Sequence, residues 1–133
     1  YQINFQNESS STVTDILIVD ELDSALDPST IQVGASSHPY TWNLTDQGRL
    51  VFHIQNIELP PVSEDEQGSR GFVKFEVAQQ ADNIVGTYIF NSATIYFAPV
   101  DVVSTDLVTH VIGEDILDQM EAIIEVNVAN LFE

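Results

Sequence analysis

The sequence predicts an all-β fold, an antiparallel sandwich or barrel, on three observations. Apolar residues recur at every second position in most segments, these segments are short, and turn residues separate them. No convincing helical period occurs before the C-terminal tail. Many short strands with regular turns are typical of sandwiches and barrels. The chain has 133 residues, of which 44% are hydrophobic, and this fits one domain with a packed core.

The first half of the chain supplies five predicted strands. In YQINFQ, Tyr1, Ile3 and Phe5 share one face. TDILIVD is almost continuously apolar, as a strand buried on both faces would be. The Asp-Gln-Gly turn between the fourth and fifth segments is a strong hairpin signal. The five segments are residues 1–6, 14–20, 29–33, 39–45 and 49–57.

An acidic loop, residues 59–69, precedes three further predicted strands at 70–77, 88–97 and 102–112. The total is therefore about seven or eight strands. Alternation assigns the large inward-facing side chains to the core, and a buried aromatic in such a core is worth several kcal/mol. The predicted core includes Phe5, Leu17, Trp42, Phe52, Phe75, Ile95 and Phe97.

The residues after Gly113 are ambiguous in period. One set of apolar positions fits a helical stripe, whereas Ile124, Val126 and Val128 fit a strand. We favour an extended segment that covers an open sheet edge, either on its own domain or on the next copy. The predicted organisation is a sandwich domain at 1–113 and an extension at 114–133 that acts as an edge strand, donor strand or linker. The helical set is Ile116, Leu117, Met120, Ile123 and Ile124.

The charge of the chain excludes several classes of partner. Three Lys and Arg residues against 21 Asp and Glu residues give a formal net charge of −18. Such a surface repels phosphate backbones, so nucleic acid is excluded as a partner, and no apolar run is long enough for membrane insertion. Cysteine is absent, which excludes disulfides and thiolate metal sites. We find no nucleophile elbow and no phosphate-binding glycine loop, and we therefore predict that the protein is not an enzyme.

The acidic clusters raise the possibility of calcium, which takes several oxygen ligands that loops at one end of a sandwich can supply. The candidate ligands are Asp20, Asp23, Asp27 and Asp82. The alternative is a solvated acidic surface suited to salty water, as charge runs usually are. We expect no other cofactor.

The stretch GASSHPYTW, residues 34–42, contains the candidate ligand-binding side chains. His38, Tyr40 and Trp42 could form an aromatic platform for a sugar. The alternative is that Tyr40 and Trp42 are core residues and that His38 and Pro39 form the corner that leads into the strand. Strict alternation favours the core. The three histidines are too scattered for a zinc spacing, and we expect them to be isolated side chains at the surface or at edges.

Asn91 and Lys74 are single residues for which a specific role can be considered. Asn91 shares a face with Ile89 and Ile95, so it should be buried, and a buried amide needs partners. We expect it to hold an adjacent loop through backbone hydrogen bonds. Lys74 could form an isopeptide cross-link only if it were buried, but alternation puts it on the face opposite Phe75.

Several motifs, in this order along the chain, resemble one family of immunoglobulin-like domains without an assigned activity. The resemblance covers Tyr1–Gly113 and implies an immunoglobulin-like antiparallel sandwich. It also implies a place near the C-terminus of a large secreted or surface-anchored bacterial protein, often before a type IX secretion signal. The motifs are YQINFQN, GASSHPY, GFVKFEV, NSATIYF and VTHVIG.

The sequence departs from the family pattern at two places. Ser69-Arg70-Gly71 stands where the family usually has Ser-His-Gly, and Ala98-Pro99 stands where it usually has Asp-Phe. Both departures argue against a two-histidine site or an acidic metal loop. The family's first strand normally lies upstream of Tyr1, so we expect a piece of a longer protein with an open sandwich edge.

These observations support two functional hypotheses from different classes. The first is a non-catalytic structural or adhesion module of a secreted or cell-surface bacterial protein. In its more specific form, this module is the subunit of a filament that assembles by strand donation. Its partners would be other copies of itself or neighbouring domains. The second is a carbohydrate-binding module whose partners are glycans and whose binding could depend on calcium.

Overall fold

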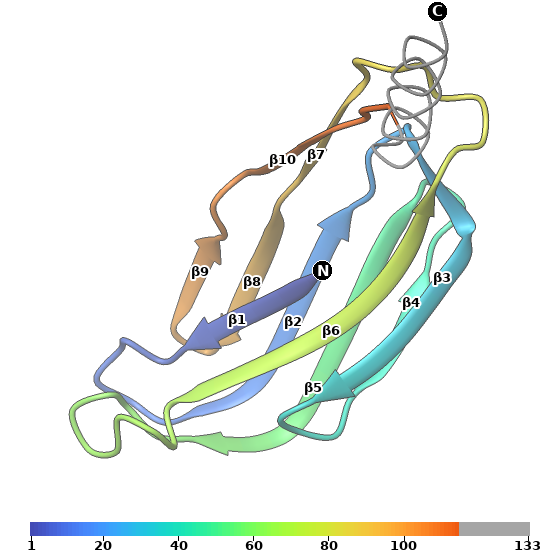
Figure 1. Cartoon of the computed structure of the whole chain (residues 1–133). Coiled ribbons are helices and arrows are strands. Elements are labelled where there is room, and N and C mark those ends of the chain that lie inside the picture. Colours follow the sequence, from blue (N-terminus) through green and yellow to red (C-terminus); the bar gives the residue numbers. More distant parts are fainter. Residues whose placement is uncertain (115–133) are drawn as a thin grey trace, which may run out of the picture.

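The computed structural model describes residues 1–114 of the chain. These residues form ten strands, joined by loops and turns (Figure 1). These residues contain no helix. Residues 115–133, which include the predicted covering segment, lie outside this description. The strands are β1 Gln2–Gln6, β2 Val13–Glu21, β3 Leu26–Ser36, β4 Thr41–Leu44, β5 Arg49–Leu59, β6 Arg70–Gln79, β7 Tyr88–Asn91, β8 Ala93–Ala98, β9 Asp101–Ser104 and β10 Val108–Val111.

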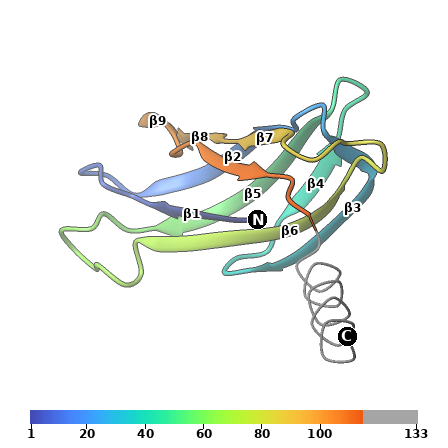
Figure 2. The ribbon, with the colours of Figure 1, turned by 45° about the horizontal axis from the view of Figure 1, so that its top comes forward.

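The strands form an antiparallel β-sandwich, as predicted. One layer has the strand order β4-β5-β2-β8-β9, the other has the order β1-β6-β3, and β10 pairs with β7. Figure 2 shows the three-stranded sheet facing the five-stranded sheet. The strand number exceeds the predicted seven or eight because two predicted strands are each divided. Residues 88–97 break at Ser92 into β7 and β8, which belong to different sheets, and residues 102–112 form β9 and β10.

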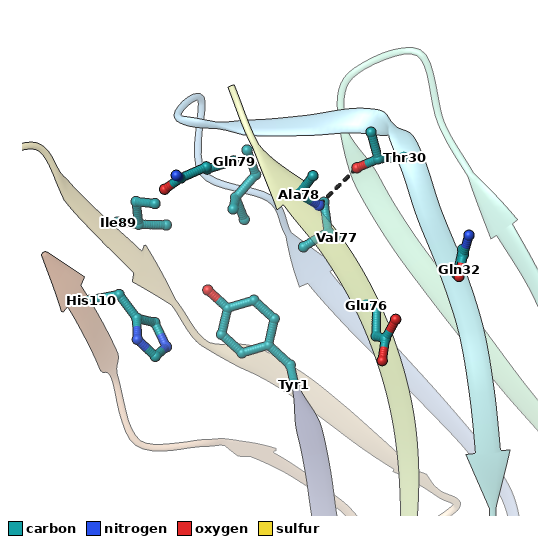
Figure 3. A pocket seen from close by; sticks show the side chains of 10 residues that line it. Tyr1, Thr30, Gln32, Glu76, Val77, Ala78, Gln79, Ile89 and His110 are labelled. Atoms are coloured by element: carbon teal, nitrogen blue, oxygen red, sulfur yellow. Dashed lines mark hydrogen bonds between the residues drawn. The ribbon is translucent and has the colours of Figure 1, made fainter. Parts of the chain in front are cut away.

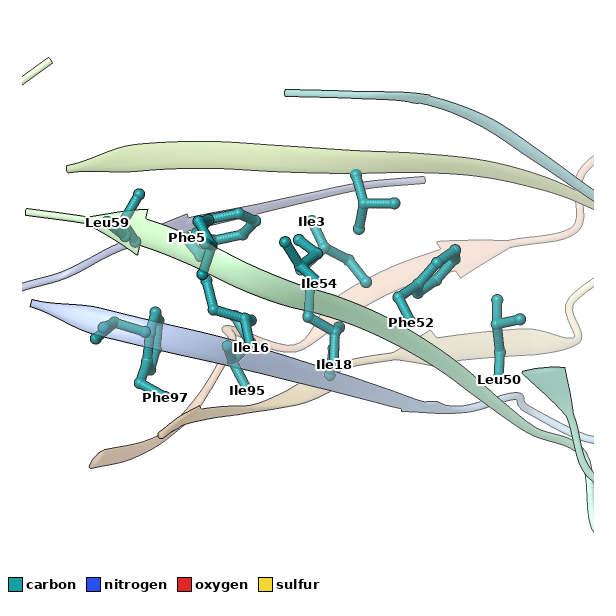
Figure 4. Close-up of a cluster of buried hydrophobic side chains, with 14 of the residues drawn as sticks. Ile3, Phe5, Ile16, Ile18, Leu50, Phe52, Ile54, Leu59, Ile95 and Phe97 are labelled. Atoms are coloured by element: carbon teal, nitrogen blue, oxygen red, sulfur yellow. The ribbon is translucent and has the colours of Figure 1, made fainter. Parts of the chain in front are cut away.

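The core lies between the two layers, and alternation decides which residues enter it. Ile16 and Ile18 of β2 point inward and are fully buried. Phe52 and Phe75 come from opposite sheets, and their ring centroids lie 5.9 Å apart. Figure 4 shows Ile16, Ile18 and Phe52 among the side chains that lie between the sheets. The buried cluster comprises Ile3, Phe5, Val13, Ile16, Ile18, Leu50, Phe52, Ile54, Ile57, Leu59, Val73, Phe75, Ala93, Ile95 and Phe97.

The assignment of Trp42 and Leu17 to the core was wrong. Trp42 lies opposite Phe52 in the register, so its side chain is on the inner face as alternation predicted. However, β4 is the edge strand of its sheet, and Trp42 stays 45% exposed because little packs over it. Leu17 points to the outer face of β2 and is only half-buried. In a continuous apolar run, the odd-numbered and the even-numbered residues are equally apolar, so the sequence does not show which of these two sets faces the core.

Candidate functional site

Within residues 1–114, strand β1 is an edge strand with an unpaired side. In this part of the chain it lies at the end of its sheet and pairs only with β6. Tyr1 and Phe75 exchange both backbone hydrogen bonds, at 2.8 and 3.0 Å. In an antiparallel pair the bonded positions recur at every second residue, so the backbone N–H and C=O groups of the residues in between point away from β6. Those residues are Gln2, Asn4 and Gln6, and the edge that they form is called the β1 edge below.

A groove of about 400 Å³ runs along the β1 edge. Ile3 and Asn4 line one side, and Val103 and Val108 from β9 and β10 line the other. The lining also includes Ile95, which belongs to the core together with Ile3. The groove therefore joins free backbone hydrogen-bonding groups to an apolar lining, which is the combination that an added strand needs.

A larger pocket of about 890 Å³ adjoins the groove, since Tyr1 lines both. Figure 3 shows Tyr1 between His110 of β10 and Glu76 of β6. The Tyr1 ring lies 5.7 Å from the His110 ring, and Ile89 adds an apolar wall. Burial, followed by the negative charges of Asp20 and Asp23, raises the pKa of the Tyr1 phenol, so this group remains a neutral hydrogen-bond donor.

A buried acid–amide pair lies beside Tyr1 and the groove. The Asn91 side chain, which also lines the groove, donates from Nδ2 to Asp20 Oδ2 at 2.7 Å. Asp20 Oδ1 and Asn91 Oδ1 are buried and have no hydrogen-bond partner among residues 1–114. Burial raises the pKa of Asp20 to about 6, and the bond from Asn91 opposes this shift. A proton on Asp20 Oδ1 would let it donate to Asn91 Oδ1, and both unpartnered oxygens would then be satisfied.

This pair tests the expectation made for Asn91. Its burial is confirmed, at 6% exposure. The expected role in holding a loop through backbone hydrogen bonds was wrong, because its bond is to the Asp20 side chain. The two residues are far apart in sequence, and only the packing of β7 near β2 brings them together. Lys74 is exposed, as alternation predicted.

The four candidate calcium ligands have separate local roles. Asp20 binds Asn91, whereas Asp23 accepts hydrogen bonds from the backbone N–H groups of Ala25 and Phe90, both at 2.9 Å. Asp27 accepts from the backbone and hydroxyl of the nearby Ser29, and Asp82 lies exposed in the turn after β6. Within residues 1–114, no three His, Asp or Glu side chains are grouped to hold a metal ion. Calcium binding stays a prediction.

A melting series tests both the calcium prediction and the charge argument. With a net charge of −18, self-repulsion should make the melting temperature rise with sodium chloride. A specific calcium site would add a further rise in calcium chloride at matched ionic strength. Equal responses to the two salts would eliminate the calcium site, and no response to either would contradict the repulsion argument.

The candidate sugar-binding residues His38, Tyr40 and Trp42 are divided between structural and exposed positions. The Tyr40 ring packs 5.5 Å from the Phe52 ring, and its hydroxyl donates to the Gly34 carbonyl at 2.7 Å, so Tyr40 is structural. The His38 ring lies 6.2 Å from the Phe5 ring. Trp42 is the most exposed of the three side chains.

The other two histidines are not isolated, contrary to expectation. His53 Nε2 lies 3.0 Å from Asp15 Oδ1, and His110 lies against Tyr1. The partners lie on other strands, so a scan for sequence spacing could not find them. The family resemblance predicted an open sandwich edge, but alternation describes side chains and could not show which backbone groups of β1 form that edge.

The fold and these features define a β-sandwich module with an open strand edge. Residues 1–111 match the model of a domain family of unknown function, DUF7619, and the chain belongs to this family. No match to the sequence was found among curated proteins. Among solved structures, the chain is similar to the collagen-binding domain from a Staphylococcus aureus adhesin, with 14% identity, 85% of each chain covered and a TM-score of 0.47. A likeness at this level carries no inference about ligands. In residues 1–114 no helix is long and apolar enough to cross a membrane.

Proposed function

We propose that this domain is a non-catalytic structural or adhesion module of a secreted or cell-surface bacterial protein, and that it assembles by strand addition at the β1 edge. The observation that carries the proposal is the set of unpaired backbone groups at Gln2, Asn4 and Gln6 beside a groove lined by core side chains. A long open edge is a template for another strand, and proteins use such edges for β-augmentation.

The candidate donor is the sequence from Ile116 to Phe132, which lies outside the described residues. Ile124, Val126 and Val128 alternate there with polar residues, so one face of an extended donor would be apolar. A donor that docks on the next copy makes a heterologous contact, and such contacts build filaments when they do not close. A donor that docks on its own domain closes the sandwich instead.

Replacing Asn4 by proline tests the β1 edge directly. Proline has no N–H, but the Asn4 N–H points away from β6, so the existing ladder loses no bond. We expect Asn4→Pro to abolish docking. If the donor segment docks on another copy, light scattering on the full chain should show that the oligomers are lost. If the donor segment docks on its own domain, the melting temperature of the variant should fall.

Asn4→Ala is the matched control because it keeps the N–H while removing the same side chain. It should behave as the unaltered chain in both measurements. A second control is Asn4→Pro in a chain that ends at Glu114, where the substitution should change neither mass nor melting. If the proline and alanine variants of the full chain behave alike in both measurements, strand addition at this edge is wrong.

A carbohydrate-binding module is the second candidate, and the pocket beside Tyr1 favours it. That pocket combines two aromatic rings with the Glu76 carboxylate and the amides of Gln32 and Gln79. Rings and hydrogen-bonding groups together are what a sugar requires. A glycan array separates the two candidates, because a structural module should bind none of its glycans, with or without calcium.

A further inference from the structure

One row of buried side chains forms the floor of the groove at the β1 edge. The row follows the inner face of β7 and β8, where every second residue is at most 6% exposed. It begins in the pocket beside Tyr1 and ends where the Phe97 ring lies 6.4 Å from the Phe5 ring. Its members are apolar except for Asn91. The row, called the floor row below, is Ile89, Asn91, Ala93, Ile95 and Phe97.

Asn91 carries an unsatisfied hydrogen-bonding group on this floor. Its Nδ2 donates to Asp20 Oδ2 at 2.7 Å, but Oδ1 of each residue has no partner within residues 1–114. Both side chains are more than nine-tenths buried. A buried acceptor without a partner costs free energy, so a strand that brings N–H donors to this point gains affinity. A carboxamide has two N–H donors, so one amide side chain could satisfy both oxygens.

The sequence after the described residues contains a row of the same composition. In an extended segment every second side chain points to the same side. From residue 124 to residue 132 the even-numbered residues are apolar except for Asn130. The odd-numbered residues of this stretch include Glu125 and Asn127, which suit a face in contact with water. The even-numbered set, called the tail row below, is Ile124, Val126, Val128, Asn130 and Phe132.

The two rows match in one register, with Asn130 over Asn91. A shift of two residues in either direction would place Val128 or Phe132 over Asn91 and leave the two buried oxygens unsatisfied. The tail then runs antiparallel to β1, because the floor row and β1 both lead away from the pocket beside Tyr1. Its end enters that pocket of about 890 Å³. The other pairs of this register are Phe132 with Ile89, Val128 with Ala93, Val126 with Ile95 and Ile124 with Phe97.

We propose that residues 124–132 of this chain are the strand that docks at the β1 edge, and that recognition of the Asn130 amide by Asn91 and Asp20 sets its register. This inference rests on the proposed strand addition and adds the side chain that makes it specific. The length of the chain allows docking on the same copy or on the next. Nine residues, 115–123, can span about 30 Å, whereas the five residues of β1 extend over about 17 Å.

Hydrogen exchange of the full chain, followed by NMR, tests this register. The amide N–H groups of Gln2, Asn4 and Gln6 point away from β6, so we expect them to be protected because the docked tail bonds to them. Asn130→Leu keeps the approximate size of the side chain and removes its donors. It should lower the protection factors of these amides roughly tenfold or more, since the two buried oxygens would then lie under an apolar group.

Asn127→Leu is the matched control. It makes the same exchange on the opposite face of the extended tail and should leave the protection unchanged. Residues 127 and 130 would share a face in a helix, so equal losses in the two variants overturn the proposal. If neither variant loses protection that the unaltered chain has, the register is wrong although strand addition stands. If the β1-edge amides of the unaltered chain are unprotected, strand addition itself is wrong and the register with it.

Discussion

Replacement of Phe52 by alanine is expected to lower the free energy of unfolding by about 3–5 kcal/mol. Phe52 is fully buried in the core, where it contacts the ring of Tyr40, just before β4, and the ring of Phe75 on β6. The ring centroids of Tyr40 and Phe75 lie 5.5 and 5.9 Å from it. The substitution removes the apolar transfer energy of the ring and leaves a cavity that rigid strands cannot close. Urea denaturation measures the change.

Trp42→Ala is the informative control for Phe52→Ala. Trp42 is the larger side chain and lies opposite Phe52 on β4, but it is 45% exposed at the sheet edge. Its loss should cost less than about 2 kcal/mol, since only the buried part of its area contributes. If the two substitutions cost the same, the assignment of Trp42 to the edge is wrong and the side chain packs in the core after all.

Replacement of Asp20 by asparagine is expected to stabilise the protein above pH 7 by roughly 3 kcal/mol, taking about 1.4 kcal/mol for each unit of pKa change. Asp20 is fully buried, and burial raises its pKa from 3.8 to about 6. Above that pH the folded state must hold a buried charge whose Oδ1 has no partner. An asparagine is neutral, and its amide can donate to Asn91 Oδ1 while it accepts from Asn91 Nδ2.

The same pKa change sets the direction of the pH dependence. Between about pH 4 and pH 6, the unfolded chain has released the Asp20 proton and the folded chain still holds it. The unfolded state therefore binds fewer protons, and stability falls as pH rises through this window. The stabilisation is fully present below pH 3.8 and is lost above about pH 6. Asp20→Asn should remove this part of the pH profile and match the unaltered protein at low pH.

Asp82→Asn is the control for the general effect of charge. Asp82 is exposed in a turn, so its replacement also removes one negative charge but relieves no burial. This variant should keep the full slope between pH 4 and pH 6. Equal slopes in the Asp20→Asn and Asp82→Asn variants would show that the pH dependence comes from general repulsion among the acids and not from the buried pair.

The β1 edge offers backbone groups at Gln2, Asn4 and Gln6 that have no partner strand within residues 1–114, so it can recognise any extended segment whose side chains fit the groove.

The sequence by itself determined the class of fold and most of the core, because alternation with period two is a local property of each strand. It predicted the inward faces of Phe5, Phe52 and Phe75 and the outward face of Lys74, and the structure confirms all four. The charge of −18 was likewise fixed by composition alone.

Only the tertiary structure decided which strands lie at the edges of the sheets and which residues from distant parts of the sequence contact one another. Trp42 is exposed because β4 ends its sheet, and the β1 edge is open because β1 ends the other sheet. Asp20 and Asn91 meet because β2 and β7 pack together, although 71 residues separate them. The period of a strand says which residues share a face, but the cover over that face depends on long-range packing, and no local pattern encodes it.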